Sequence, residues 1–360
     1  MNEKMFDILN KFCLEGAPVS CERYGSGHIN ETYLVTTDSC RRYILQKISG
    51  NAFKDIPALM ENVCRVTEFL RERTDNPREV VSLIPTKDGG SYIVYEGEYW
   101  RIYDFLEDTL CLQLPESEED FYQSALCFGH FQQLLAEFPV EKLHETIPDF
   151  HNTPDRFRKF RETLKENPLH RAEEVEREIA FALSHEREMA TLQTMRDEGV
   201  LPERVTHNDT KLNNVLFDEK TRTALCVIDL DTVMPGLSPY DYGASIRFGA
   251  STAAEDEQDL RKVGIDLDLF RIYTRGYLES CPSLTDKEIE MLPMGAKTMT
   301  FEDGLRFLTD YIDGDNYYHI SRPLQNLDRC RSQFKLVEEM EAKWDDMMRI
   351  VEEERQSLRK

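Results

Sequence analysis

The spacing of apolar residues in the first hundred positions predicts a small mixed unit of strands and one helix. Residues 31–37 (ETYLVTT) and 42–48 (RYILQKI) are rich in β-branched and aromatic residues, and a short polar turn separates them, as in a hairpin. From 55 to 73 the apolar positions recur at helical spacing, and Pro57 suits the first turn of a helix. Further strand-like runs follow at 80–85, 91–95 and 99–106.

Helical periodicity dominates the remainder of the chain. A pair of strands around 215–230 interrupts the helical pattern. We therefore expect an α+β fold with two domains, an N-terminal domain over 1–106 and a helical C-terminal domain over 107–360, because strand gives way to helix near 104–108. The predicted helices lie near 118–137, 154–165, 171–198, 266–280, 285–311 and 327–358.

Composition is that of a globular protein without a membrane segment. Apolar residues make up 40% of the 360 residues and charged residues 31%, and no apolar run approaches the ~18 residues of a membrane helix. The N-terminus predicts an amphipathic helix with Phe6, Leu9 and Phe12 on one face, and Glu3 and Asp7 argue against a signal peptide. We expect no membrane partner.

Cysteine and histidine spacing argues against disulfide frameworks and zinc sites. The nine cysteines are odd in number and form no C-x-x-C pair, which indicates reduced thiols and a cytoplasmic protein. The eight histidines form no H-E-x-x-H motif, so a zinc enzyme is not expected.

The net charge of −24 arises from 44 basic and 68 acidic residues. Nucleic acid needs a basic surface, so we expect no nucleic-acid partner. The charge suits a cationic ligand such as an aminoglycoside or choline, but many cytoplasmic enzymes are acidic for solubility alone. Both interpretations stay open at this point.

Residues 207–214 (HNDTKLNN) place acidic and amide side chains in a loop that leads into a strand. Asp209 and Asn214 are five residues apart, and Asp229 ends the second strand of the pair, so a hairpin can bring the three side chains together. Their hard oxygen atoms suit Mg²⁺, and phosphoryl transfer needs one carboxylate for the acceptor hydroxyl and two ligands for the metal. The alternative is a loop of capping residues, but spacing and context agree on the first reading.

The pattern H-x-D-x-x-x-x-N followed by I-D resembles the catalytic loop and metal aspartate of the protein-kinase-like fold. With HND and IDL in place of HRD and DFG, the chain resembles the aminoglycoside and choline phosphotransferase superfamily. Six segments between about 25 and 340 resemble bacterial N-acetylhexosamine 1-kinases: GSGHINETY, YILQKI, HNDTKLNN, VIDLDTVMPG, SIRFGA and RFLTDY. The resemblance implies a two-lobed protein-kinase-like fold of the aminoglycoside phosphotransferase type. It also implies ATP and Mg²⁺ as cofactors and the anomeric hydroxyl of N-acetylglucosamine or N-acetylgalactosamine as acceptor.

The resemblance assigns roles by position. Asp209 takes the place of the catalytic base, Asn214 and Asp229 those of the metal ligands, and Lys211 that of a lysine on the transferred phosphate. Lys47 matches the strand lysine that grips the α- and β-phosphates. Its expected partner is Glu61 on the following helix, where Glu68 also lies, and His207 is expected to brace the loop.

Other positions in the nucleotide half have competing interpretations. Gly25 and Gly27 form either a phosphate-binding loop or an ordinary turn, and His28 or Asn30 either touches phosphate or caps that turn. Lys47 alone would be an ordinary strand lysine whose stem is buried. Asp231 is either a structural hydrogen-bond acceptor or a ligand of a sugar hydroxyl or a second metal.

The acceptor site is expected on the helical domain. Glu302, Arg306 and Asp310 are spaced to lie on one helix face, which is usually a solvated ladder of salt bridges. Apolar neighbours predict a buried helix instead, and a buried ladder is costly unless it meets a polar ligand, so Arg306 is predicted to bind a sugar oxygen. Tyr317, Tyr318 and Trp100 are candidates for stacking on the sugar, although core packing is the simpler role.

Ala244 departs from the pattern of the family, which has an aspartate there. If that aspartate touches substrate, Ala244 changes activity or specificity; if it only caps a loop, alanine costs about 1 kcal/mol of stability. Asp241 nearby is expected to hold the catalytic loop by hydrogen bonds.

Three functions therefore remain in view: a kinase for N-acetylhexosamines, a kinase for an aminoglycoside, choline or homoserine, and a nucleotide-binding scaffold without turnover. The presence of Asp209, Asn214 and Asp229 argues against the scaffold. We expect a monomer that acts on a small molecule.

Overall fold

The computed structural model describes residues 3–25 and 29–359. Its contacts divide the chain into two compact units. The small unit comprises Met1–Leu110, Glu137–Pro148 and Leu216–Pro235, and the large unit comprises Cys111–Ala136, Asp149–Val215 and Gly236–Lys360. The first boundary thus lies near the predicted residue 106, but the small unit also takes in two later segments. Periodicity locates a change from strand to helix and carries no information about which sheet a later segment joins.

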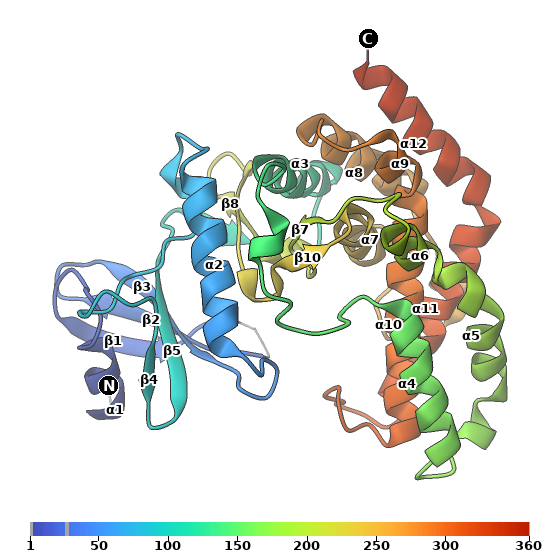
Figure 1. Ribbon diagram of the computed structural model, residues 1–360, viewed down its shortest axis with the longest axis horizontal. Helices are drawn as coiled ribbons and strands as arrows, with labels where there is room; N and C mark the ends of the chain where they lie inside the picture. The colour runs from blue at the N-terminus through green and yellow to red at the C-terminus, as the bar shows by residue number, and fades with distance from the viewer. Residues whose placement is uncertain (1–2, 26–28, 360) are drawn as a thin grey trace. The chain divides into compact units, whose positions relative to one another are not determined.

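The small unit is built on a five-stranded antiparallel sheet, coloured blue to cyan in Figure 1. The predicted hairpin is confirmed as β2 (Glu31–Thr37) and β3 (Arg42–Ile48). Residues 80–85 contribute only isolated bridges at Val80 and Leu83, whereas β1 was not predicted. The strand order is β1-β2-β3-β5-β4, with β1 at Pro18–Arg23, β4 at Ile93–Tyr95 and β5 at Glu98–Asp104.

Each face of this sheet is covered by one helix. The short α1 (Glu3–Leu9) packs on one face through Ile8 and Leu9, together with the nearby Phe12. Phe6 is 46% exposed, so the predicted Phe6–Leu9–Phe12 face is only partly confirmed. On the other face lies α2 (Ile56–Arg71), which begins where the Asp55 carboxylate accepts the Ala58 N–H at 3.0 Å.

A second sheet carries the segment that contains the predicted metal aspartate. It is three-stranded, in the order β6-β8-β9, with β6 at Thr109–Cys111, β8 at Val215–Asp218 and β9 at Ala224–Val227. The predicted strand pair around 215–230 is therefore confirmed. A short 3₁₀ turn, η5 (Leu230–Thr232), follows β9 directly after Asp229.

The large unit is mainly helical, and three helices that were predicted as continuous are broken. The predicted 171–198 helix divides into α5 and α6, 285–311 into α9 and α10, and 327–358 into α11 and α12, while α7 was not predicted. The helices are α3 (Glu118–Leu134), α4 (Thr153–Glu166), α5 (Glu176–Met189), α6 (Thr191–Asp197), α7 (Ser238–Gly249), α8 (Leu267–Ser280), α9 (Asp286–Glu290), α10 (Leu292–Asp313), α11 (Gln325–Ala342) and α12 (Trp344–Leu358).

Shorter elements complete the chain. The strands are β7 (Arg204–Thr206) and β10 (Met234–Gly236), and the 3₁₀ turns besides η5 are η1 (Pro77–Glu79), η2 (Val140–Lys142), η3 (Ala172–Glu174), η4 (Leu212–Asn214) and η6 (Leu260–Lys262).

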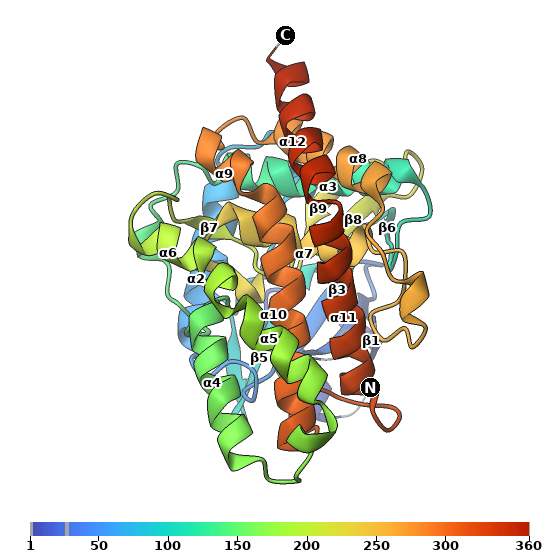
Figure 2. The ribbon, with the colours of Figure 1, turned by 90° about the vertical axis from the view of Figure 1, so that its right-hand side faces the viewer.

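Helix α10 is the central element of the large unit, with α4, α5 and α11 packed around it (Figure 2). It also crosses α7 at very short range. A side chain at Gly243 would collide with the backbone of Gly295, and one at Gly295 would collide with the backbone of Pro239. Glycine at both positions therefore lets the two helix backbones touch.

All nine cysteines are free thiols. Over residues 3–25 and 29–359, every helix is too short or too polar to cross a membrane.

Candidate active site

The predicted catalytic loop gathers three of the predicted site residues in the large unit. It follows β7 and ends in η4. The Asn214 side-chain amide donates to the Asp209 carbonyl at 2.8 Å and to its carboxylate at 3.1 Å, and the Lys211 ammonium lies 3.1 Å from the same carboxylate. The side chain of Asp209 is 36% exposed, so its carboxylate is both oriented by protein groups and open to a ligand.

The buried Asp241 on α7 holds this loop from behind, as predicted. Its carboxylate accepts the backbone N–H groups of His207 and Asn208 at 2.8 and 2.7 Å and the Gln132 amide at 2.7 Å. The Thr210 hydroxyl donates to the Asp241 carbonyl. Burial raises the pKa of Asp241, and the three donors act in the opposite direction.

His207 packs beside the loop, as expected for a bracing residue. Its ring meets Phe128 and Phe131 edge-on, at centroid distances of 5.7 and 6.1 Å. Its Nδ1 lies 3.3 Å from the Asp209 backbone nitrogen. The ring thus fixes the backbone that presents the Asp209 carboxylate.

His151 is a residue that the sequence interpretation missed. Its Nε2 lies 3.3 Å from the Asn208 carbonyl, one residue before Asp209, and its Nδ1 lies 3.0 Å from the buried Glu302 carboxylate on α10. Both partners are acceptors, so the ring serves both only when each nitrogen carries a proton. A lone histidine in a loop gives no periodic signal, and only the fold shows that it links α10 to the catalytic loop.

The predicted metal ligand Asp229 lies in the small unit. It follows β9 with a left-handed backbone (φ 62°) that opens η5. Two residues later, Asp231 is 4% exposed, pairs with the Arg101 guanidinium at 2.5 Å and accepts the Asn30 amide at 2.6 Å. These contacts support the structural alternative for Asp231 over a substrate role.

Lys47 has partners other than the predicted one. Its ammonium pairs with Glu31 and, at 3.0 Å, with Glu98, and hydrogen bonds to both raise its pKa. Glu61 instead pairs with Arg65 and with His144 at 2.6 Å. The predicted Lys47–Glu61 pair is therefore not the one that forms, because Lys47 points away from the face on which α2 packs.

The glycine turn is described only in part. Gly25 has a left-handed backbone (φ 74°), with open space where a side chain would stand. Gly27 and His28 lie outside the described residues. Asn30 donates to Asp231 and accepts the Ser49 N–H at 3.0 Å, so it holds the base of the turn.

Helix α10 is largely buried, as predicted, so the alternative of a solvated salt-bridge ladder of Glu302, Arg306 and Asp310 is excluded. Glu302 accepts from His151 and from the Thr153 hydroxyl at 3.2 Å, and Arg306 pairs with Asp303 at 3.2 Å. Glu302 thus takes its partners from other elements, whereas Arg306 pairs within α10.

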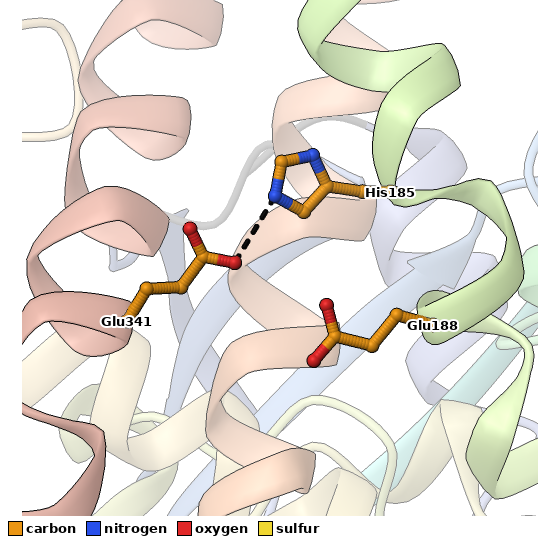
Figure 3. Close-up of side chains that lie close together, drawn as sticks. All are labelled: His185, Glu188 and Glu341. Carbon is orange, nitrogen blue, oxygen red and sulfur yellow. Dashed lines mark hydrogen bonds and ion pairs between the residues drawn. The ribbon is translucent and has the colours of Figure 1, made fainter.

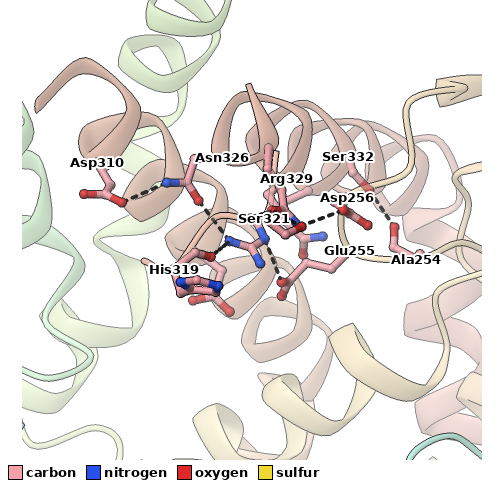
Figure 4. A network of polar contacts seen from close by, with 12 residues as sticks. Ala254, Glu255, Asp256, Asp310, His319, Ser321, Asn326, Arg329 and Ser332 are labelled. Atoms are coloured by element: carbon pink, nitrogen blue, oxygen red, sulfur yellow. Dashed lines mark hydrogen bonds and ion pairs between the residues drawn. The ribbon is translucent and has the colours of Figure 1, made fainter. Parts of the chain in front are cut away.

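The third member of that set, Asp310, organises a surface loop. Its carboxylate accepts the backbone N–H groups of Tyr317 and Tyr318 at 2.7 and 2.9 Å, and the Asn326 amide at 2.8 Å. Figure 4 shows how this contact continues through Asn326 and Arg329 toward the 254–256 segment. The network fixes the loop beyond α10 against α11.

Arg306 lies in a polar, aromatic part of the large unit. Its guanidinium lies 5.4 Å from the Tyr318 ring centre and 6.0 Å from that of Phe150, and Asp303 also pairs with Arg247 at 2.9 Å. Burial would lower the pKa of Arg306, yet nearby Tyr318 and Asp303 raise it, so the side chain stays charged.

The three aromatic candidates differ in accessibility. Tyr317 is 75% exposed, and the Tyr318 side chain packs on Phe307 with a buried hydroxyl. Trp100 is buried in the sheet core beside α1, so the core-packing interpretation holds for it.

One group of residues outside the predicted site has the composition of a metal site. Figure 3 shows His185, Glu188 and Glu341, whose ligand atoms lie within 4.8 Å of one another. The Lys297 ammonium already pairs with Glu188 at 2.6 Å and with Glu341 at 2.8 Å. This cation satisfies both carboxylates, so the group is an ion-pair network that joins α5, α10 and α11.

The predicted magnesium ligands have suitable chemistry. Asn214 turns its amide nitrogen toward Asp209, which leaves its carbonyl oxygen facing elsewhere, and Asp229 supplies a carboxylate. Carboxylate and amide oxygens are the donors that Mg²⁺ takes in phosphoryl-transfer sites. The residues therefore fit the metal that the sequence predicts.

The phosphotransferase enzyme family matches residues 20–274, which is most of the chain. The protein belongs to this family. Its fold is the two-lobed protein-kinase-like fold, as the sequence predicted.

Solved structures agree on that fold at low sequence identity. A microcompartment-associated aminopropanol kinase is 15% identical with a TM-score of 0.63, covering 95% of this chain and 97% of its own. Spectinomycin phosphotransferase with ADP and spectinomycin is 14% identical with a TM-score of 0.58, covering 94% and 97%. An amicoumacin kinase in complex with AMP-PNP, Ca²⁺ and Ami is 12% identical with a TM-score of 0.59, covering 95% and 94%.

Ala244 lies inside α7, three residues after Asp241, and packs against the cluster that contains Met294 and Met299. Asp241 on the same helix holds a loop through its carboxylate, so both interpretations of an aspartate at position 244 stay predictions.

Proposed function

We propose that this protein transfers the γ-phosphoryl group of ATP to a hydroxyl of a small molecule, and that the acceptor is the anomeric hydroxyl of an N-acetylhexosamine. The observation that carries the proposal is the Asp209 carboxylate, which is oriented by Asn214, Lys211 and a loop anchored on buried Asp241. A half-exposed, pre-oriented carboxylate is what a phosphotransferase needs to receive the proton of the acceptor hydroxyl.

In the proposed reaction the acceptor oxygen forms a bond to the γ-phosphorus while the bond to the β-phosphate oxygen breaks. Asp209 accepts the hydroxyl proton, and Lys211 offsets charge on the transferred group. Asn214 and Asp229 are the proposed ligands of Mg²⁺, which when bound supplies positive charge to the phosphate oxygens. Asp241 and His151 hold the loop during this step.

The sugar acceptor is supported by the six sequence segments that resemble N-acetylhexosamine 1-kinases. It is also supported by the surroundings of Arg306, where a partly buried cation and aromatic rings lie together on the large unit. Sugars are bound by charged hydrogen-bond donors and by ring stacking, so Arg306 is the proposed contact to a sugar oxygen.

An amino alcohol or aminoglycoside is the second candidate acceptor. The net charge of −24 favours a cation, and the aminopropanol and spectinomycin enzymes share this fold. The fold itself does not discriminate between acceptors, since function depends on the site.

The test measures ADP release from Mg·ATP with N-acetylglucosamine, N-acetylgalactosamine, galactose, kanamycin, choline and aminopropanol, each against a blank without acceptor. We expect turnover with the two acetylated sugars and a phosphorus NMR signal for an anomeric phosphate. Turnover only with an amine would show that the proposed acceptor is wrong and that the proposed phosphoryl transfer is right. Binding of Mg·ATP without turnover of any acceptor would favour the scaffold.

A further inference from the structure

The two cations of the central strands, Lys47 and Arg101, stand on opposite faces of the five-stranded sheet. In the register of β3 and β5, Gln46 pairs with Arg101 and Lys47 pairs with Trp100. Paired residues share a face and neighbours along a strand alternate, so Arg101 shares a face with Gln46 and not with Lys47.

Lys47 belongs to the face covered by α1. Its strand partner Trp100 is part of the core beneath α1, and its ion-pair partner Glu98 also pairs with Lys4 of α1 at 2.9 Å. The Lys47 side chain is 27% exposed. Its contacts are those of a partly solvated charge ladder at the edge of that core.

Arg101 belongs to the face covered by α2. Its guanidinium donates twice to the Gln46 side-chain oxygen, at 3.0 and 2.8 Å, and contacts the Met60 sulfur of α2 at 3.7 Å. It pairs with Asp231 at 2.5 Å, and the two side chains are 1% and 4% exposed. Arg101 is thus the buried cation on the side of the sheet where the Asp229–Asp231 segment lies.

Asp231 passes this contact on to Asn30. Its second oxygen accepts the Asn30 amide at 2.6 Å, and the Asn30 carbonyl oxygen accepts the Ser49 N–H at the end of β3. A continuous chain of contacts therefore joins Arg101 to the segment after Asp229 and to Asn30, which precedes β2.

The charge of Arg101 is secure in this setting. Burial would lower its pKa, but the carboxylate of Asp231 more than compensates, and Asp229 acts in the same direction. A buried arginine with one carboxylate partner gives a fixed geometry, because its planar group cannot leave that partner without losing both charge pairing and hydrogen bonds.

We propose that Arg101, and not Lys47, is the cation that organises the nucleotide side of the small unit, by fixing Asp231 and thereby both Asp229 and Asn30. Arg101 acts as a positioning residue. The β3 residue on the same face of the sheet as Arg101 is Gln46, whereas Lys47 lies on the opposite face. The inference rests on the proposed function in that Asp229 is a ligand of the nucleotide-bound metal.

The experiment compares Arg101→Met with Lys47→Met, which remove one cation each from adjacent strands of the same sheet. The Kd for Mg·ADP is measured by calorimetry, without any acceptor, over a range of Mg²⁺ concentrations. Removing a group that orients a metal ligand typically weakens binding about 10- to 100-fold. We expect such a loss for Arg101→Met, with a higher Mg²⁺ requirement, and a change below about threefold for Lys47→Met.

A second variant separates positioning from folding. Arg101→Met leaves Asp231 buried without its cation, so Arg101→Met/Asp231→Leu is made to remove both charges together. We expect the double variant to unfold near the wild-type temperature and still to bind Mg·ADP weakly. Wild-type affinity in the double variant, or a loss in Lys47→Met equal to that in Arg101→Met, overturns the proposal.

The failure of the proposed function is separable from this result. If no sugar is phosphorylated but Mg·ADP binding depends on Arg101, the inference holds and only the acceptor is wrong. Absence of Mg·ADP binding by the wild-type protein overturns both.

Discussion

Two buried aspartates, one in each unit, hold the segments that carry the predicted catalytic residues, and they do so by different means. Asp241 holds the loop before Asp209 by accepting two backbone N–H groups and an amide. Asp231 holds the segment after Asp229 through the guanidinium of Arg101 and the amide of Asn30. One anchor depends on the main chain, and the other depends on a side-chain cation.

This difference determines whether a second substitution can compensate for the loss of each aspartate. Backbone donors cannot be removed by mutation, so any loss of the Asp241 carboxylate leaves them unsatisfied in the interior. The cation at Arg101 can be removed together with its partner. The first anchor is therefore fixed by geometry, whereas the second is a pair that can be exchanged as a unit.

The largest effect is expected at Asp209, the half-exposed residue whose loop Asp241 holds. Asp209→Asn keeps the shape but removes the base, so kcat should fall by about 10²- to 10⁴-fold with little change in KM. Steady-state kinetics with the acceptor found in the panel checks this. Asp268→Asn, at an exposed position on α8, is the control, and near-full turnover of Asp209→Asn would remove the base assignment.

Asp241→Ala should destabilise the large unit, because the backbone donors of the loop cannot be removed together with their acceptor. It leaves three buried donors without an acceptor, each worth about 1–3 kcal/mol, so the free energy of unfolding should fall by about 3–5 kcal/mol. Denaturant unfolding followed by circular dichroism measures this change. A loss below about 1 kcal/mol would show that water replaces the carboxylate and that the loop does not depend on it.

Asp231→Ala should destabilise the small unit by about 3–5 kcal/mol, because Arg101 is left as an uncompensated buried charge. The double variant Arg101→Met/Asp231→Leu should recover most of that loss. If the double variant is no more stable than Asp231→Ala, the loss at Asp231 cannot be compensated, and the proposed difference between the two aspartates is wrong.

Acid should act on ion-paired carboxylates rather than on Asp241. Burial would raise the pKa of Glu288, but the hydrogen bonds from Arg204, Thr285 and Ser238 lower it below its ordinary 4.5. A carboxyl with a lower pKa in the folded state stabilises the fold above pH 4.5, and this stabilisation is lost as the pH falls further.

The pKa of Asp241 is raised, so its protonation contributes no such loss. Thermal unfolding between pH 7 and pH 3 should show a steeper decline for the wild type than for Glu288→Gln. Equal slopes would mean that other carboxylates determine the acid response.

The smallest effect is expected at Ala244. Ala244→Asp places a carboxylate against the cluster of Met294 and Met299, so the free energy of unfolding should fall by about 1 kcal/mol, the typical loss for a single substitution. If the aspartate of the family touches substrate, kcat/KM for the acceptor rises instead of staying constant. Paired unfolding and kinetic measurements on this one variant separate the two roles.

Local signals predicted much of the fold. The hairpin of β2 and β3 and the start of α2 at Asp55 follow from alternation and capping, which act within a few residues. The breaks between α5 and α6 and between α11 and α12 did not follow from local signals. The apolar pattern continues across each break, so packing against other elements determines where the helix ends. Helix α7 was missed because its burial on nearly all sides removes any periodicity.

The sequence identified the residues of the catalytic loop, but it did not predict which side chains from distant segments contact the site residues. Asp209, Lys211 and Asn214 lie within six residues, so a local motif identified them and the structure shows them in contact. The pairing of Lys47 with Glu98 and the link from His151 to Glu302 join residues more than fifty positions apart. Spacing along one strand or helix cannot supply such contacts, which explains why these predictions failed or were never made.

The contact of α7 and α10 at Gly243 and Gly295 has a consequence for how this protein can diversify. Helix α7 carries Asp241, which fixes the loop of Asp209, and α10 carries Glu302 and Arg306. Since the backbones touch, α10 cannot shift toward a new acceptor without moving α7 and, with it, the loop of Asp209. New specificities must therefore come from side-chain exchange and loop remodelling, while the packing of α7 on α10 stays the same.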